Sequence, residues 1–150
     1  MDRRTTVEPD QDLDVITVLT RQHALIRDLF DAVERSQPAD RRETFGRLVR
    51  LLAVHEEAEE VVVHPVALAR LNGGAEIVAN RRREAGHVRE LIRTVDPDSP
   101  DFTRDLEVLR ATVFAHVTAE ERYEYAALDS VTSAAERHVM AEEVRETFRH

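Results

Sequence analysis

Apolar residues recur along most of the chain at spacings of three and four positions, which predicts helices rather than strands. Only four Gly and five Pro interrupt this pattern. The first eleven residues are polar, and we expect them to be disordered. The pattern predicts five helices at approximately these positions: 12–35, 40–71, 75–95, 99–128 and 133–150.

Short turns separate the first four predicted helices, each of roughly 20 to 30 residues, so that neighbouring helices should run antiparallel. The predicted fold class is therefore all-α. We expect an up-down-up-down antiparallel four-helix bundle over residues 12–129, followed by a short fifth helix within residues 130–150. The apolar residues of this C-terminal helix indicate that it packs across the bundle or onto another chain.

Local signals support two of the helix starts and one interruption. Asp40 followed by Glu43 resembles a capping box, and Ser133 followed by Glu136 resembles another. Pro65 lies near the end of the second predicted helix and should kink or interrupt it.

Composition narrows the class of protein. The chain has 150 residues, the size of one domain, and a formal charge of −9 from 30 acidic and 21 basic residues. Phosphate binding needs a basic stripe, and the single basic run is Arg81-Arg82-Arg83, so we expect no nucleic-acid partner. No apolar run reaches the roughly 18 residues of a membrane span. Because the chain has no Cys and no signal-peptide pattern, we expect a cytoplasmic location. The sequence does not predict the oligomeric state.

Each of the four long predicted helices carries ionisable residues where its apolar stripe should continue. The first stripe contains one His, the second and fourth each contain a His followed four residues later by a Glu, and the third contains a Glu followed three residues later by a His. Together these candidate metal ligands are His23, His55, Glu59, Glu84, His87, His116 and Glu120.

Ionisable groups at core positions cost several kcal/mol each unless they are paired or bind a metal. Residues three or four apart share one helix face, so each pair presents an imidazole and a carboxylate together. In an antiparallel bundle these groups can converge at one height. Four imidazoles and three carboxylates are too many for one tetrahedral zinc, whereas mixed nitrogen and oxygen ligation suits iron or manganese, including two ions bridged by carboxylates.

The order of these residues is specific: a lone His23 in "RQHALIRDLF", the HxxxE of "HEEAEE", His87 in "EAGHVRELI", and the HxxxE of "HVTAEERYEYAAL". In this order the chain resembles the hemerythrin-like, or HHE cation-binding, family from about Asp14 to Leu128. The resemblance implies a non-heme centre of two Fe ions with an oxo or hydroxo bridge, Mn being less favoured. It implies Glu59 and Glu120 as bridging carboxylates and the four histidines as terminal ligands.

One departure from the family pattern concerns the third helix. Oxygen-carrying hemerythrins have two His four residues apart there, whereas the residue four before His87 is Arg83. The fifth terminal ligand could be Glu84, Glu56 or a tyrosine, or the position could be open. A carboxylate in place of an imidazole would stabilise ferric iron and favour redox chemistry or sensing over reversible oxygen carriage.

Several neighbouring residues receive weaker assignments. Tyr123 continues the fourth stripe and is expected to pack in the bundle or to donate a hydrogen bond near the site. His64 is expected to be exposed or to lie just outside the ligands. The remaining acidic residues are assigned to an exposed face: Glu57, Glu60, Glu121 and Glu124.

The leading functional hypothesis is a di-iron protein that binds or reduces O2, hydrogen peroxide or NO, including catalase-like removal of peroxide. The alternative is an iron or oxygen sensor, or an interaction module, without turnover. A metal-free bundle with a pH-sensitive core is a third reading. A ferritin-like oxidase is a weaker rival, because that class expects two Glu-x-x-His motifs and this chain has one, at Glu84 and His87.

Overall fold

The computed structural model describes residues 13–149, and every regular element among them is helical. The predicted disordered segment of residues 1–11 lies outside the described residues. The elements are α2 (Val15–Arg35), α3 (Pro38–Ala58), the π-helix η1 (Glu59–Val63), α4 (His64–Arg70), α5 (Gly74–Thr94), α6 (Phe102–Ala119), the π-helix η2 (Glu120–Tyr125), α7 (Ala126–Val131) and α8 (Ala134–Phe148).

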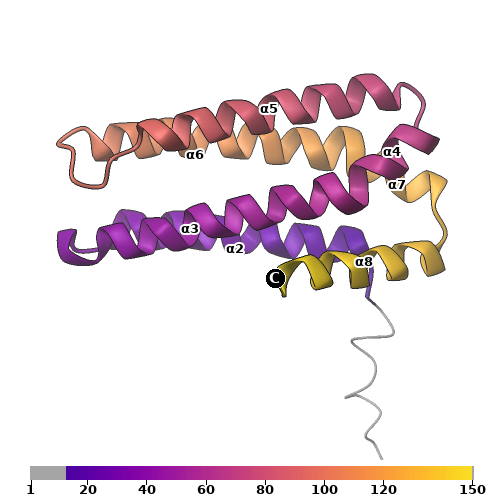
Figure 1. Ribbon diagram of the computed structural model, residues 1–150, viewed down its shortest axis with the longest axis horizontal. Coiled ribbons are helices and arrows are strands. Elements are labelled where there is room, and N and C mark those ends of the chain that lie inside the picture. Colours follow the sequence, from indigo (N-terminus) through magenta and orange to yellow (C-terminus); the bar gives the residue numbers. More distant parts are fainter. Residues whose placement is uncertain (1–12, 150) are drawn as a thin grey trace, which may run out of the picture.

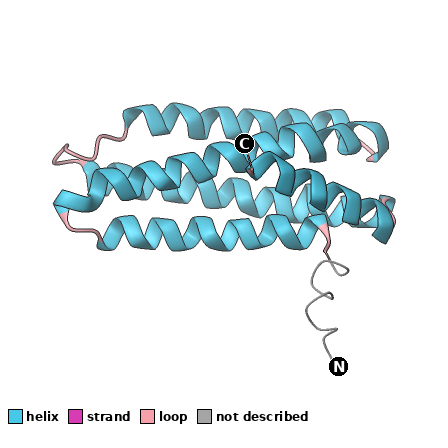
Figure 2. Cartoon of the chain, turned by 60° about the horizontal axis from the view of Figure 1, so that its bottom comes forward, coloured by secondary structure: helices cyan, strands magenta, loops and turns pink. Residues whose placement is uncertain are grey.

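The helices form two antiparallel pairs. In Figure 1, α2 and α3 make one pair and α5 and α6 the other, with the chain reversing direction at each turn. Helix α8 returns along α2 and α3 and contacts both. Figure 2 shows that helices account for nearly all of the described chain and that the turns lie at the two ends. The all-α bundle predicted from the sequence is confirmed, and α8 packs on the bundle itself.

Most predicted helix starts lie within a few residues of the observed ones. Asp14 caps α2, and its side chain accepts a hydrogen bond from the Ile16 backbone N–H at 2.8 Å. Helix α3 begins at Pro38, earlier than the capping box predicted at Asp40, and Gln37 precedes it without a side-chain cap. Proline fits this first turn because its missing N–H has no helical partner there.

Both helices that carry an HxxxE pair widen into a π-helix that begins at the glutamate. At η1 the His64 backbone N–H donates to the Glu59 carbonyl, five residues back. The following Pro65 explains this turn, because its ring and missing N–H disturb the ordinary four-residue pattern. At η2 the Ala126 N–H donates to the Glu121 carbonyl in the same way. Each π-helix changes which of the residues that follow it face the interior of the bundle.

The apolar core has two main parts. One lies toward the α2–α3 and α5–α6 turns and includes Ile26 and Phe30, and the other lies against α8 and includes Leu19. On α2 both buried residues between Leu19 and Ile26 are polar: they are Gln22 and His23, and His23 is 2% exposed. The ionisable residues therefore lie in the middle of the bundle, between two apolar clusters.

Helix α8 is anchored at its start by the capping box that the sequence predicted. The Ser133 side chain accepts from the Glu136 N–H at 3.1 Å, and the Glu136 carboxylate accepts from the Ser133 N–H at 2.8 Å. We expect Ser133→Ala to lower the free energy of unfolding by about 1 kcal/mol, measured by chemical denaturation. Ser130→Ala is the control, since the Ser130 hydroxyl bonds only within its own helix in the described chain. Equal stabilities of the two variants would contradict the assignment.

Candidate metal centre

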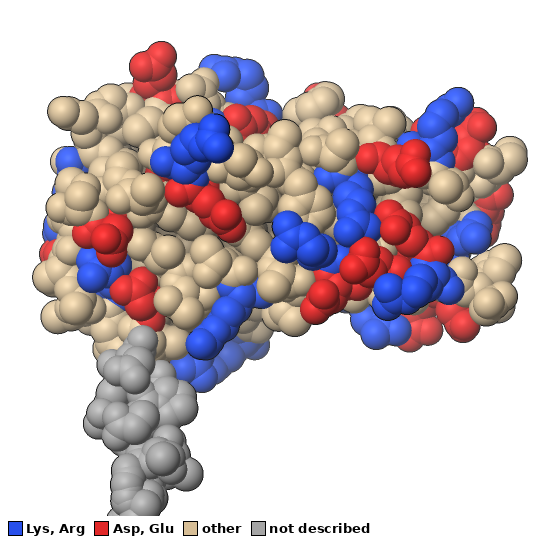
Figure 3. Space-filling view, turned by 180° about the vertical axis from the view of Figure 1, so that it is seen from behind, with Lys and Arg blue, Asp and Glu red and all other residues tan. Residues whose placement is uncertain are grey.

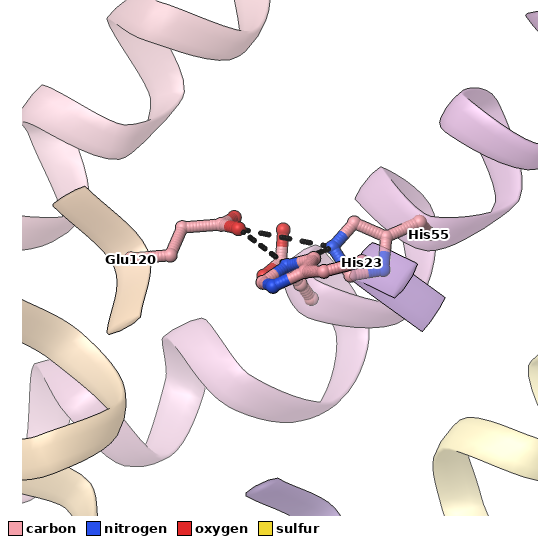
Figure 4. Close-up of side chains that lie close together, drawn as sticks. His23, His55 and Glu120 are labelled. Atoms are coloured by element: carbon pink, nitrogen blue, oxygen red, sulfur yellow. Dashed lines mark hydrogen bonds and ion pairs between the residues drawn. The ribbon is translucent and has the colours of Figure 1, made fainter. Parts of the chain in front are cut away.

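Four buried side chains from four different elements converge in the middle of the bundle. They are His23 of α2, His55 of α3, Glu59 of η1 and Glu120 of η2, and each offers a ligand atom within 4.8 Å of the others. None is more than 4% exposed. Figure 4 shows the two imidazoles and the Glu120 carboxylate pointing toward one another.

The distances among these groups are short. The Nε2 atom of His23 lies 3.2 Å from Nε2 of His55 and 3.0 Å from a Glu120 oxygen. His116, four residues before Glu120, extends the cluster, because its Nε2 lies 3.0 Å from the second Glu120 oxygen. The Tyr125 hydroxyl donates to the Glu59 carboxylate. Five of the seven predicted ligand residues are therefore brought together.

The three clustered histidines share one orientation. Nδ1 of His23 donates to the Glu121 carboxylate, Nδ1 of His55 to the Gln22 amide oxygen, and Nδ1 of His116 to the Glu84 carboxylate. Each of these contacts is 2.7 Å long. Since every Nδ1 donates its hydrogen outward, every Nε2 faces the centre, where a neutral ring presents its lone pair. Histidines that bind metals are held in this manner, with the other ring nitrogen bonded to an oxygen acceptor.

Without a metal, the cluster holds protons. Burial alone would lower the pKa of His55, but the Glu59 and Glu120 carboxylates raise it to about 10. Burial likewise opposes protonation of His116, whose pKa is raised to about 9, chiefly by Glu120. Burial and the neighbouring Glu120 raise the pKa of Glu59 to about 7. The centre therefore demands positive charge, which protons or a metal cation can supply.

The donor set fits a metal. Two carboxylates and three imidazole Nε2 atoms converge in the bundle interior, and one Glu120 oxygen is buried without a hydrogen-bond donor among the described residues. Imidazole and carboxylate ligands suit iron and manganese, and carboxylates can bridge two ions. The residues that could hold the metal are His23, His55, Glu59, His116 and Glu120.

The structure places Glu84 outside the cluster of ligand atoms. Its carboxylate accepts two hydrogen bonds of 2.8 Å from the buried Arg81 and one from Nδ1 of His116. Although partial burial opposes ionisation, these donors hold the pKa of Glu84 below its ordinary value. Glu84 therefore orients His116 and lies outside the cluster of ligand atoms.

The structure places His87 away from the cluster. Its side chain is exposed on α5, whereas Ala85 and Val88 face the interior. The apolar pattern of the third helix is weak. The buried face predicted from the sequence is offset by about one residue from the face that is buried in the structure. Helix α5 therefore brings no His or Glu into the cluster.

None of the other candidates for a fifth ligand joins the cluster. Glu56 pairs with Arg89 at the surface, and the buried tyrosine, Tyr125, donates its hydroxyl proton to Glu59. On the α5 side the cluster opens instead into a pocket of about 290 Å³. Its walls are largely apolar and include these side chains: Ile26, Leu52, Ala85, Val88, Ile92 and Val113.

A second layer of buried polar residues lies beside the cluster, and it was not predicted from the sequence. His64 Nδ1 donates to the Glu124 carboxylate at 2.8 Å, and Glu124 is fully buried rather than part of an exposed acidic face. Tyr125 is 1% exposed, whereas Tyr123 is exposed. A regular helix would place Tyr123 inside, so the π-helix η2 accounts for both differences. Pro65 signals η1, but we find no corresponding signal in the sequence of η2.

The helical bundle and the buried His/Glu cluster define a metal-binding domain of the hemerythrin type. The family model for the hemerythrin HHE cation-binding domain matches residues 14–143. The chain therefore belongs to this family, and the resemblance inferred from its motifs is confirmed.

Two individual proteins are similar to this chain. A hemerythrin HHE cation-binding domain-containing protein from Mycobacterium kansasii has a TM-score of 0.81 at 19% identity, covering 91% of this chain and 85% of that one, which is a likeness of fold. A protein named DNA nickase from Nostoc sp. is 28% identical over 137 residues. The match covers 90% of this chain but 39% of that protein, so the chain spans about two fifths of the length of this curated relative.

The pKa of Glu59 leads to a prediction for the metal-free protein. The ordinary value is 4.5 and the folded value about 7, so Glu59 costs stability increasingly as the pH rises through this interval. We expect Glu59→Gln, which stays neutral, to raise the thermal midpoint of chelator-treated protein at pH 8 by at least about 3 °C, and to change it little at pH 5.

Glu57→Gln, at an exposed position on the preceding turn, is the matched control and should show no such pH dependence. Scanning calorimetry at the two pH values measures both variants. A lower midpoint for Glu59→Gln at pH 8 would show that the carboxylate stabilises the metal-free fold.

Proposed function

We propose that this chain holds a non-heme di-iron centre with His23, His55, Glu59, His116 and Glu120 as its protein ligands. The observation that carries the proposal is the shared orientation of the three histidines, each with Nδ1 bonded outward and Nε2 turned inward. A structural polar core has no need for three histidines that all turn Nε2 toward the same two carboxylates. In this proposal Glu59 and Glu120 would supply the carboxylate oxygens that hold the two ions.

The bound iron would supply Lewis acidity and electron transfer to a small oxygen-containing ligand. The residues of the chain then have defined tasks. Glu121, Gln22 and Glu84 fix the imidazole rings. Burial and the nearby carboxylates raise the pKa of Tyr125 well above its usual range, so its hydroxyl stays protonated and keeps donating to Glu59.

The small ligand we propose is O2, hydrogen peroxide or NO, and the activity we favour is catalase-like removal of peroxide. The absence of an α5 ligand among the described residues supports this, because it leaves the cluster accessible from the apolar pocket at Ala85. In this reaction two peroxide molecules give one dioxygen and two water molecules. One peroxide is oxidised and the other reduced, so no outside reductant is needed.

The second candidate function is an iron or oxygen sensor without turnover. The cluster supports it as well, because two buried carboxylates and three imidazoles couple metal occupancy to the stability of the bundle. A large rise in thermal midpoint on iron loading, without oxygen evolution from peroxide, would favour the sensor.

The DNA chemistry named for the Nostoc relative is not carried over. Acidic and basic side chains are interleaved on the face seen in Figure 3, whereas phosphate binding favours a continuous basic surface. The chain also carries a formal charge of −9. No helix of the described chain is long and apolar enough to cross a lipid bilayer. A cytoplasmic location stays a prediction from the sequence.

The ligand set can be tested by iron content. Protein purified from iron-supplemented cells should contain about two Fe per chain, with near-ultraviolet absorption from bridged ferric ions. We expect His55→Ala and His116→Ala each to lose at least about half of the iron, because each removes one Nε2 donor. His87→Ala is the matched control and should keep it all. Iron loss in His87→Ala, or full iron in the other two variants, would contradict the proposed ligands.

The open side of the cluster can be tested by closing it. We expect Ala85→His to keep its iron but to evolve oxygen from peroxide at least about tenfold more slowly, because the new imidazole fills the access side. Ala79→His, at an exposed position on the same helix, should leave the rate unchanged. Oxygen electrode measurements compare the three proteins. An unchanged rate in iron-loaded Ala85→His would place peroxide access elsewhere.

A further inference from the structure

The pocket beside the cluster is much larger than a diatomic ligand or peroxide requires. A water molecule occupies roughly 30 Å³ of liquid, and an apolar cavity of about 150 Å³ holds a benzene molecule. The pocket has a volume of about 290 Å³. Even with metal at its end near Glu120, room remains for an organic molecule.

The shape of the pocket is elongated along the bundle. On α5 its lining runs from Ala85 to Arg93, which corresponds to roughly 12 Å of helix. Along α3 and into the start of η1 it runs from Val49 to Glu59. Most side chains between these ends are aliphatic, with the Glu56–Arg89 ion pair at the border of the wall, so the pocket can accommodate an extended aliphatic chain.

The two ends of the pocket differ in charge. At one end lie the buried carboxylates and imidazoles of the cluster, and at the other lies Arg93. Helix α5 contains five Arg and three Glu, although the whole chain is acidic. Its other arginines are engaged: Arg81 with Glu84, Arg82 with Glu60, Arg83 with Asn80 and Arg89 with Glu56. Within the described part of the chain no acidic group pairs with Arg93.

We propose that this pocket binds a small aliphatic carboxylic acid, with its alkyl chain along the apolar walls and its carboxylate on Arg93. The bound alkyl tail then points toward the His/Glu cluster. Apolar walls with one polar anchor are the usual composition of a small-molecule site. This assignment depends on the pocket and on Arg93, and it holds whether or not the cluster turns over peroxide.

Octanoate, with about ten heavy atoms, is the probe, since the pocket has about twice the volume of a cavity that holds benzene. Isothermal titration calorimetry on the protein as purified should give a Kd below about 1 mM. We expect Arg93→Glu to weaken binding at least about tenfold, since it replaces a charge-assisted hydrogen bond by repulsion. Arg83→Glu makes the same charge change on the same helix outside the pocket and should leave the Kd within about twofold.

A second pair of variants tests the apolar walls. Ala53 lines the pocket at an exposed position, so Ala53→Phe should fill the pocket without disturbing the core and should weaken octanoate at least about tenfold. Ala79→Phe, exposed on α5 and outside the pocket lining, is the control and should bind normally. Loss of binding in Ala53→Phe alone supports the pocket, and equal effects of the two variants contradict it.

Further comparisons test whether the carboxylate of the bound acid contacts Arg93. Octanol should bind at least about fivefold more weakly than octanoate, because it lacks the charge that meets Arg93. Equal binding of octanol, or no octanoate binding at all, would overturn the proposal. If octanoate affinity falls on chelation and is unchanged in Arg93→Glu, the carboxylate lies on the metal and the assignment to Arg93 is wrong. A protein that binds octanoate but evolves no oxygen from peroxide separates this site from the proposed activity.

Discussion

The central constraint in this structure is the burial of two carboxylates between two apolar clusters. Glu59 and Glu120 are at most 2% exposed, and burial of unpaired charge costs several kcal/mol. The bundle meets this cost by surrounding the carboxylates with the imidazoles of His23, His55 and His116. The arrangement is stable only when a cation, either protons or a metal, sits among these groups.

The same constraint explains the residues around the cluster. Each imidazole needs an acceptor for its outer N–H, and Glu121, Gln22 and Glu84 supply them. Glu84 in turn needs a cation, and the buried Arg81 donates to both of its oxygens. Such a chain of partners fixes ring orientation from the surface inward. It makes Glu84 important for the site although it lies outside the cluster of ligand atoms.

The sequence was informative where its periodicity was strong. The His and Glu of the two HxxxE pairs, and His23, stand in stripes of large aliphatic residues, so their position in the bundle could be predicted. The stripe on the third helix is weakly apolar, which is why His87 was placed inside and Ala85 was overlooked. Local periodicity also carries no information about a π-helix without a proline, so Glu124 and Tyr125 were missed.

The third helix sets this chain apart within its own fold. In the oxygen-carrying pattern that helix supplies ligands, whereas here α5 presents Ala85 and Val88 to the interior and brings no His or Glu of its own into the cluster. A methyl group at Ala85 is much smaller than an imidazole, so it leaves space beside the cluster. The lining on this side is largely aliphatic and also includes Arg89 and Arg93. The small side chain of Ala85 thus accounts for a pocket that borders the cluster.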